Sequence, residues 1–94
     1  MRIVGLPILD TCKKNHADSR AQFNAWQKHV QHANWGTSQD VKREYRTADF
    51  LADNTVIFNI KGNSYRLVVK VNYQKKLVVI LWAVTHADYS KESF

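Results

Sequence analysis

The chain has 94 residues, 45% of them hydrophobic and 12% aromatic, which allows one modest core and argues against a disordered segment. Its longest apolar run, residues 77–84, is far shorter than the roughly 20 residues that span a bilayer. Fourteen Lys and Arg against eight Asp and Glu give a formal net charge of +6, which favours a polyanionic or acidic partner and says nothing about fold.

The N-terminal segment and the cysteine content indicate the compartment. Gly5, Pro7 and Asp10 interrupt the apolar residues near the N-terminus, and no small-residue cleavage site follows, so no signal peptide is predicted. Cys12 is the one cysteine in the sequence, which fits a reducing environment. We expect a soluble, cytoplasmic protein with a single domain over residues 1–94 and no membrane association.

Two helices are predicted in the first third of the chain. Residues 2–4 can form a short strand, and Pro7 suits the first turn of a helix that ends near Lys14. Asp18 suits the cap or first turn of a second helix. The apolar side chains of that helix recur at helical spacing, which predicts a buried face: Phe23, Trp26, Val30 and Ala33.

The segment after the second helix is expected to connect helices to sheet. Trp35 should pack back onto the core, and Ser38 can cap a short helix that runs through Glu44. The densest basic cluster of the chain follows: Lys42, Arg43 and Arg46. We also expect the large apolar side chains of Phe50 and Leu51 to pack onto the core.

Three strands are predicted in the second half of the chain, over residues 55–60, 64–73 and 77–84. Gly62 and Asn63 suit a hairpin turn between the first two. The last strand is apolar at every position, so it should be central and covered on both faces. These elements predict an α+β fold, with two N-terminal helices packed on a small, mostly antiparallel sheet.

The middle strand separates an apolar face from a basic face. Leu67 and Val69 alternate with Arg66 and Lys70, so the helices should cover the apolar side and leave the basic side exposed or lightly covered. Arg66 and Lys70 are about 13 Å apart at roughly 3.3 Å per residue, a spacing suited to phosphates along extended RNA. Arginine can bind a phosphate through two parallel hydrogen bonds, and lysine adds a point charge. The alternative is an ordinary solvated sheet face.

His86 and Tyr89 follow the last predicted strand. Cleavage of RNA at its 2′-OH needs a base for that hydroxyl, a cation for the charge on phosphorus and an acid for the 5′-oxygen. His86, Arg66 and Tyr89 are our candidates for these catalytic roles. The alternative is a terminal segment that is merely pinned to the core.

No cofactor is predicted. His29 and His32 are three residues apart on the second helix and could touch one metal ion, but no nearby Cys or acid completes a ligand set. The sequence also contains no phosphate-binding glycine loop, no CxxC pair and no nucleophile elbow. We therefore expect His29 and His32 to be ordinary surface residues of the helix rather than a metal site.

Several blocks of the sequence resemble HigB-type toxins of bacterial type II toxin–antitoxin systems, within the RelE/ParE-like superfamily. The blocks are FNIKGNSYRLVV at residues 58–69 and THADY at residues 85–89, preceded by Asn34-Trp35 and Ala48-Asp49-Phe50. The resemblance implies a RelE-like fold and a metal-independent endoribonuclease that cleaves translated mRNA at the ribosome. It also implies a cognate partner, a HigA-like helix-turn-helix antitoxin.

The resemblance also indicates site residues. Lys61 and Arg66 match basic positions of the family, and His86 and Tyr89 match its T-H-x-x-Y ending. We expect RNA contacts from Lys61 and from further cations of the chain: Lys70, Lys42, Arg43 and Arg46.

The chain departs from the family at two positions. Leu81 and Val84 stand where many relatives carry an Arg and a Gly. If that Arg contacts phosphate, this chain lacks one cation, and Lys70 or the basic cluster can substitute. Two alternatives therefore stay open: a non-catalytic homologue that binds RNA or the ribosome, and a ParE-like inhibitor of a protein target.

Overall fold

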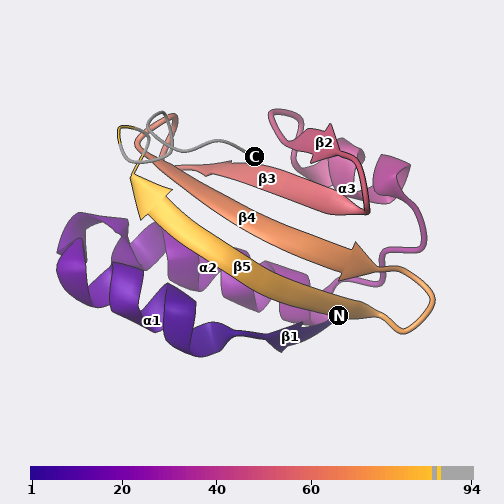
Figure 1. Cartoon of the computed structure of the whole chain (residues 1–94), viewed down its shortest axis with the longest axis horizontal. Coiled ribbons are helices and arrows are strands. Elements are labelled where there is room, and N and C mark those ends of the chain that lie inside the picture. The colour runs from indigo at the N-terminus through magenta and orange to yellow at the C-terminus, as the bar shows by residue number, and fades with distance from the viewer. Residues whose placement is uncertain (86, 88–94) are drawn as a thin grey trace.

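A five-stranded sheet forms the frame of the protein in a computed structural model that describes residues 1–85 and 87 (Figure 1). The strands lie in the order β1-β5-β4-β3-β2. Their bounds are β1 (Arg2–Val4), β2 (Asp49–Leu51), β3 (Thr55–Ile60), β4 (Tyr65–Asn72) and β5 (Leu77–Thr85). β1 pairs with β5 in parallel, and the other three pairings are antiparallel. The predicted sheet is confirmed, and β2 adds an edge strand that the sequence did not reveal.

The helices are α1 (Leu6–Asn15), α2 (Arg20–His32) and α3 (Ser38–Glu44), with a short 3₁₀ helix, η1 (Ala17–Ser19), between the first two. In Figure 1 the strands lie in front of α1 and α2, so both helices cover one face of the sheet. This arrangement confirms the predicted α+β fold. We call the opposite face, which carries Arg66, Val68 and Lys70, the helix-free face.

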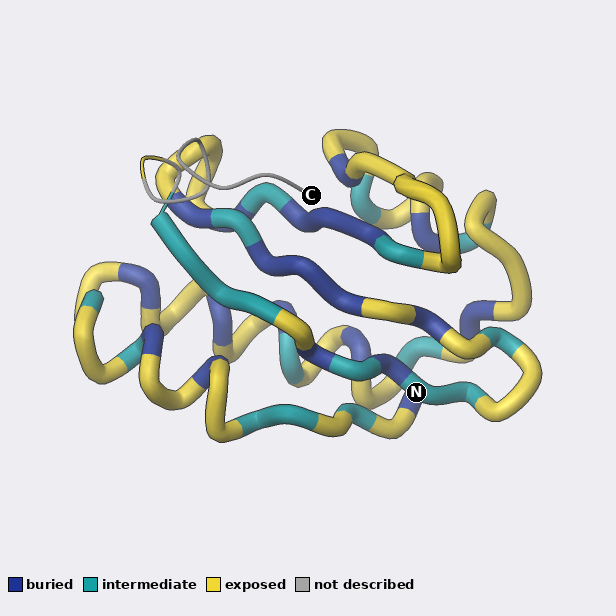
Figure 2. Tube along the Cα trace, viewed as in Figure 1, coloured by how far each residue is buried: buried dark blue, intermediate teal, exposed yellow. Residues whose placement is uncertain are grey.

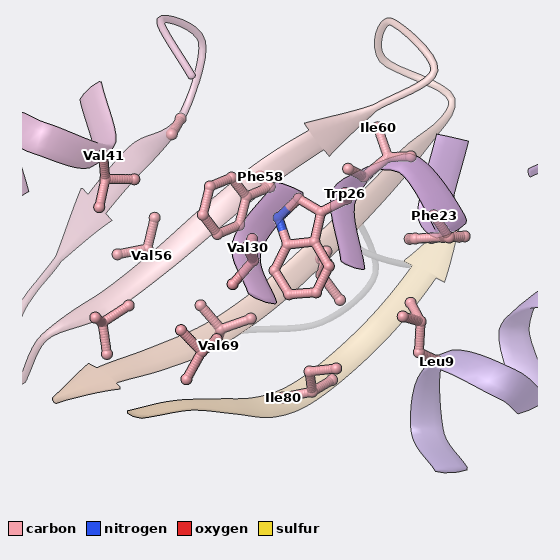
Figure 3. Close-up of a cluster of buried hydrophobic side chains, with 14 of the residues drawn as sticks. Leu9, Phe23, Trp26, Val30, Val41, Val56, Phe58, Ile60, Val69 and Ile80 are labelled. Atoms are coloured by element: carbon pink, nitrogen blue, oxygen red, sulfur yellow. The ribbon is translucent and has the colours of Figure 1, made fainter. Parts of the chain in front are cut away.

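The core lies between the helices and the sheet. Phe23, Trp26 and Val30 of α2 are buried, as their helical spacing predicted. Trp26 points from α2 toward the strands (Figure 3), and its ring centroid lies 5.5 Å from that of Phe58. Trp35 also packs onto Phe58, with 6.2 Å between ring centroids and an interplanar angle of 22°. Aromatic contacts from two separate segments therefore meet at the centre of β3.

The start of α1 is fixed by a glycine. Gly5 has a φ of 95° and lies so close to β5 that an added Cβ atom would meet the Ile80 carbonyl oxygen at 2.8 Å. A larger residue would have to move the helix away from the sheet. Gly5 therefore lets α1 begin directly after β1 while it packs closely against β5.

Two predicted features of the connecting segment are wrong. Phe50 and Leu51 are 37% and 43% exposed, because β2 is the outer strand of the sheet and has a neighbour on one side only (Figure 2). The cap of α3 is Thr37 rather than Ser38. The hydroxyl of Thr37 accepts from the backbone N–H of Asp40, and the Asp40 carboxylate accepts from the backbone N–H of Thr37.

Replacing Thr37 with Ala should lower the free energy of unfolding by about 1 kcal/mol, the usual effect of removing a helix N-cap. The reason is that the Asp40 N–H loses its acceptor at the start of α3. Urea unfolding measures the change. Thr47→Ala is the matched control, because Thr47 is exposed in the turn after α3. Equal effects of the two substitutions would contradict the capping role.

A β-bulge near the end of β5 reverses which face of the sheet its following side chains lie on. Val69 pairs with Ile80 whereas Val68 pairs with Trp82, so Leu81 is the extra residue. Beyond the bulge the alternation reverses, which puts Trp82 on the helix-free face beside Val68. Leu81 is 44% exposed. The expectation that β5 is covered on both faces is therefore wrong at this position.

Candidate nucleic-acid interface

The register of the strands places Arg66 and Lys70 on the same face of β4. Arg66 lies opposite Asn59 and Val84, and Lys70 lies opposite Thr55 and Val79. Because directly opposed residues share a face, these pairs form two rows across the helix-free face. Lys70 is exposed in its row. The predicted shared face of the two cations is confirmed.

The helix-free face is more covered than the sequence predicted. Ile57 and Val68, which lie in the row between the two cations, are each only 1% exposed although they lie outside the main core. The Arg66 side chain is 17% exposed, and its Nη1 atom lies 3.7 Å from the Asp49 carboxylate of β2. Arg66 is therefore a held guanidinium with a carboxylate neighbour, rather than an exposed surface cation.

Lys61 lies apart from Arg66 and has a different partner. Its Nζ donates to the Asp18 carboxylate at 2.9 Å, and the Tyr65 hydroxyl donates to the other oxygen of the same carboxylate at 2.6 Å. Tyr65 is buried in the core under the helices. Lys61 is therefore held toward the helix side of the sheet and is paired with an acid. Its role in RNA binding remains a prediction.

Asp18 has a different function from the helix cap that its position suggested. Ser19 is the residue before α2, and Asp18 lies within η1. The hydrogen bonds from Tyr65 and then from Lys61 lower the pKa of the Asp18 carboxyl. The same bond to Asp18, together with burial, raises the pKa of Tyr65 to about 12. This cluster of Asp18, Lys61 and Tyr65 ties the hairpin between β3 and β4 to η1.

The raised pKa of Tyr65 predicts a loss of stability in alkaline solution. The fold favours the neutral phenol, whose ordinary pKa is about 10. That contribution is therefore complete below pH 10 and is lost as the pH rises through about 12. Urea unfolding at pH 8 and pH 11 should show a smaller alkaline loss for Tyr65→Phe than for the unaltered chain. Equal losses in both proteins would contradict the coupling between Tyr65 and Asp18.

The basic cluster after α3 has its own contacts. Lys42 donates to the Ala48 carbonyl at 2.9 Å and lies 5.9 Å from the centroid of the Phe50 ring. Arg43 pairs with Asp40 at 3.2 Å, and Arg46 is exposed in the turn that follows. These cations lie on α3 and the approach to β2 rather than on β4. Their part in RNA binding remains a prediction.

The two helix histidines each have a partner within the protein. His29 contacts the Glu44 carboxylate, which also accepts from the Trp35 indole at 2.9 Å. His32 lies 2.9 Å from the Lys28 carbonyl oxygen through Nδ1. Within residues 1–85 and 87, no group of three potential metal ligands occurs.

Two of the three candidate catalytic residues, His86 and Tyr89, lie outside the described residues. β5 ends at Thr85, which pairs with Tyr65. Val84 pairs with Arg66, so His86 follows the partner of Arg66 by two positions along the sequence. Leu81 is the bulge residue, and Val84 lies directly across from Arg66.

Sequence reasoning missed the acidic partners of two predicted site cations, Arg66 and Lys61. Asp49 is 17 positions from Arg66, and Asp18 is 43 positions from Lys61. No local pattern links residues at such separations. The positive charge of these residues was the one available signal that acidic partners exist, because a partly buried cation normally requires a nearby acceptor.

A family model for HigB_toxin, described as the RelE-like toxic component of a toxin–antitoxin system, matches residues 19–92. No match was found among curated proteins. In the described part of the chain, no helix is long and apolar enough to cross a membrane.

Proposed function

Because this chain belongs to the HigB family, the RelE-like toxic component of a toxin–antitoxin system, we propose that it inhibits translation by cleaving mRNA on the ribosome. The family also implies an antitoxin partner. We propose that this partner is a HigA-like helix-turn-helix protein and that the toxin acts in the cytoplasm. The reaction requires no metal in this proposal.

The observation that carries the proposal is the position of Arg66. Its guanidinium is held on the helix-free face, opposite Val84 and on the same face as Lys70. A held arginine provides oriented hydrogen-bond donors for the charge that develops on a phosphate. Such donors stabilise the transition state more than a mobile surface charge does. Lys70 adds a second cation for the RNA backbone. Both groups suit a substrate with repeated phosphates.

The proposed reaction is a transesterification. His86 accepts the proton of the 2′-OH while the 2′-oxygen forms a bond to phosphorus. The bond from phosphorus to the 5′-oxygen breaks, and Tyr89 donates a proton to that oxygen. Arg66 stabilises the added negative charge on the phosphoryl oxygens. The products are a 2′,3′-cyclic phosphate on one fragment and a 5′-hydroxyl on the other.

Asp49 gives Arg66 a competing ligand. The ion pair at 3.7 Å is long, and the Asp49 side chain is exposed, so an RNA phosphate can replace the carboxylate. A second candidate function follows from the same pair and from Leu81. With one cation fewer than its relatives and another bound to an acid, the chain could bind RNA or the ribosome without cleaving.

Controlled expression of the chain tests the proposal. Growth should stop when the chain is produced without an antitoxin, and Arg66→Ala should remove the arrest. Arg20→Ala is the matched control, since Arg20 is an exposed arginine of α2 outside the candidate site. Arrest without loss of message supports non-catalytic binding, and inhibited DNA supercoiling with intact message supports a ParE-like action. Normal growth with well-folded protein contradicts the toxin proposal.

A further inference from the structure

A hollow of about 460 Å³ lies on the helix-free face. It is lined by Leu51, Ala52, Asp53, Thr55, Val68 and Leu81. Two of these side chains, Leu51 of β2 and Leu81 of β5, are more than 40% exposed although they are large and apolar. The volume falls within the range of sites that bind small organic groups. The hollow is therefore an apolar recess with room for one planar ring system.

The bulge in β5 contributes one wall of this hollow. A regular pairing would not include the extra residue, Leu81, between the partners of Val68 and Val69. With the bulge present, Leu81 lines the recess together with Val68, which is 1% exposed and closed to solvent. The departure from the family at Leu81 thus places an apolar side chain in the recess.

The hollow extends from the row of Lys70, which holds Leu51 and Thr55, to Val68 in the next row, and Arg66 lies one row beyond Val68. Val68 is midway between Arg66 and Lys70 on β4, about 7 Å from each at roughly 3.3 Å per residue. Thr55, another lining residue, is the direct pairing partner of Lys70. Long side chains can reach inward from both positions toward phosphates that flank one nucleoside. An apolar recess beside a stretch of strand that carries one cation on each side of Val68 is complementary to a base with a phosphate on each side.

We propose that this hollow binds one base of the RNA near the cleavage site, while Arg66 and Lys70 contact the phosphates on either side of that nucleotide. The inference rests on the proposed ribonuclease function and identifies one RNA base as the part of the substrate that the helix-free face recognises. Apolar contact with the exposed side chains of Leu51 and Leu81 takes the place of the neighbouring bases on the two faces of the bound base. The phosphate contacts position the strand, and the hollow distinguishes its bases.

Asp53 gives the hollow a chemical preference. It lines the recess, and its carboxylate can only accept hydrogen bonds. Cytosine, adenine and guanine can donate to it from an exocyclic amino group, whereas uracil has no amino group and offers only its ring N3–H. The backbone fixes Asp53 in a tight turn, with a φ of 60° and a bond from the Thr55 N–H to the Ala52 carbonyl. Asn tolerates the same left-handed conformation, so Asp53→Asn changes the chemistry without changing the turn.

The test compares cleavage positions in a reconstituted translation reaction that contains ribosomes and a message with every codon. The proteins are the unaltered chain, the double variant Leu51→Ala and Leu81→Ala, Asp53→Asn, and the matched control Ile8→Ala. Ile8 is a partly exposed apolar residue of α1 outside the hollow. Both leucines are exposed, so their truncation should leave the fold intact. The readout is the base frequency at each position around the cut.

The unaltered chain should prefer amino-bearing bases about 5- to 100-fold at one position, the range expected for one base contact. The double variant should lose the preference at that position alone, and Asp53→Asn should admit uracil there, while Ile8→Ala keeps the original profile. Cleavage by all four proteins with one unchanged profile overturns the base site and leaves the proposed function standing. Absence of cleavage by the unaltered chain overturns both. If the double variant keeps its base profile but escapes the antitoxin, the hollow is a protein-binding site and the inference is wrong.

Discussion

Replacing Arg66 with Ala should reduce the rate of mRNA cleavage by about 10²- to 10³-fold, the usual effect of removing one preorganised donor to a developing oxyanion. The Arg66 side chain is only 17% exposed in its place on β4, so its donors are oriented before substrate binds. Arg66→Lys should give an intermediate rate, because it keeps the charge and loses the planar pair of donors. Single-turnover cleavage on programmed ribosomes measures all three rates.

Asp49→Asn separates the chemical role of Arg66 from a structural one. If Asp49 competes with phosphate for the guanidinium, removing its charge should preserve or increase cleavage. If the ion pair only holds the fold, Asp49→Asn and Arg66→Ala should both lower the free energy of unfolding and the rate. Urea unfolding of each variant is the control. Full activity of a folded Arg66→Ala protein would rule out the proposed role.

Replacing Phe58 with Ala should lower the free energy of unfolding by about 3–5 kcal/mol, because it removes a fully buried ring and leaves a cavity. The ring centroid of Phe58 lies 4.9 Å from that of Tyr45 and 5.5 Å from that of Trp26. The loss is a large part of the roughly 5–15 kcal/mol that stabilises a domain of this kind. The variant should therefore unfold at much lower urea concentration.

Phe50→Ala is the matched control for Phe58→Ala. Phe50 lies on the edge strand and is 37% exposed, so its loss should change stability far less. A similar effect of both substitutions would show that the aromatic cluster around β3 is not the centre of the core.

Elements with a strong local pattern could be predicted from the sequence. The spacing of Phe23, Trp26 and Val30 identified the buried side of α2, and alternation along β4 separated Leu67 and Val69 from the basic face. In each case the relevant neighbours lie within one helix turn or one strand, so composition and period carry the information.

Features that depend on distant pairing could not be predicted. β2 is short, and its edge position depends on β3, so the exposure of Phe50 and Leu51 had no local signal. The bulge at Leu81 depends on the register with β4. An apolar run such as β5 predicts burial, whereas the extra residue turns one of its side chains outward. Pairing therefore decides what periodicity alone leaves open.

The candidate site divides in the same way. The shared face of Arg66 and Lys70 followed from strand alternation, and register confirms it. The ion pairs of the cations could not be predicted from strand alternation. Asp49 and Asp18 are distant in the sequence and come close to Arg66 and Lys61 only in the folded chain. These acidic partners change the interpretation of the site. Lys61 ties the hairpin between β3 and β4 to η1 on the helix side of the sheet, whereas Arg66 and Lys70 share the face proposed for RNA.

The most direct test of the account is to map new 5′ ends in a message translated in a purified system with the toxin added. We predict 5′-hydroxyl ends within the translated region when ribosomes are active and none when ribosomes are omitted. When Arg66→Ala replaces the unaltered chain, these ends should appear about 10²- to 10³-fold more slowly. An intact message at a toxin concentration that stops protein synthesis would contradict cleavage as the mode of action.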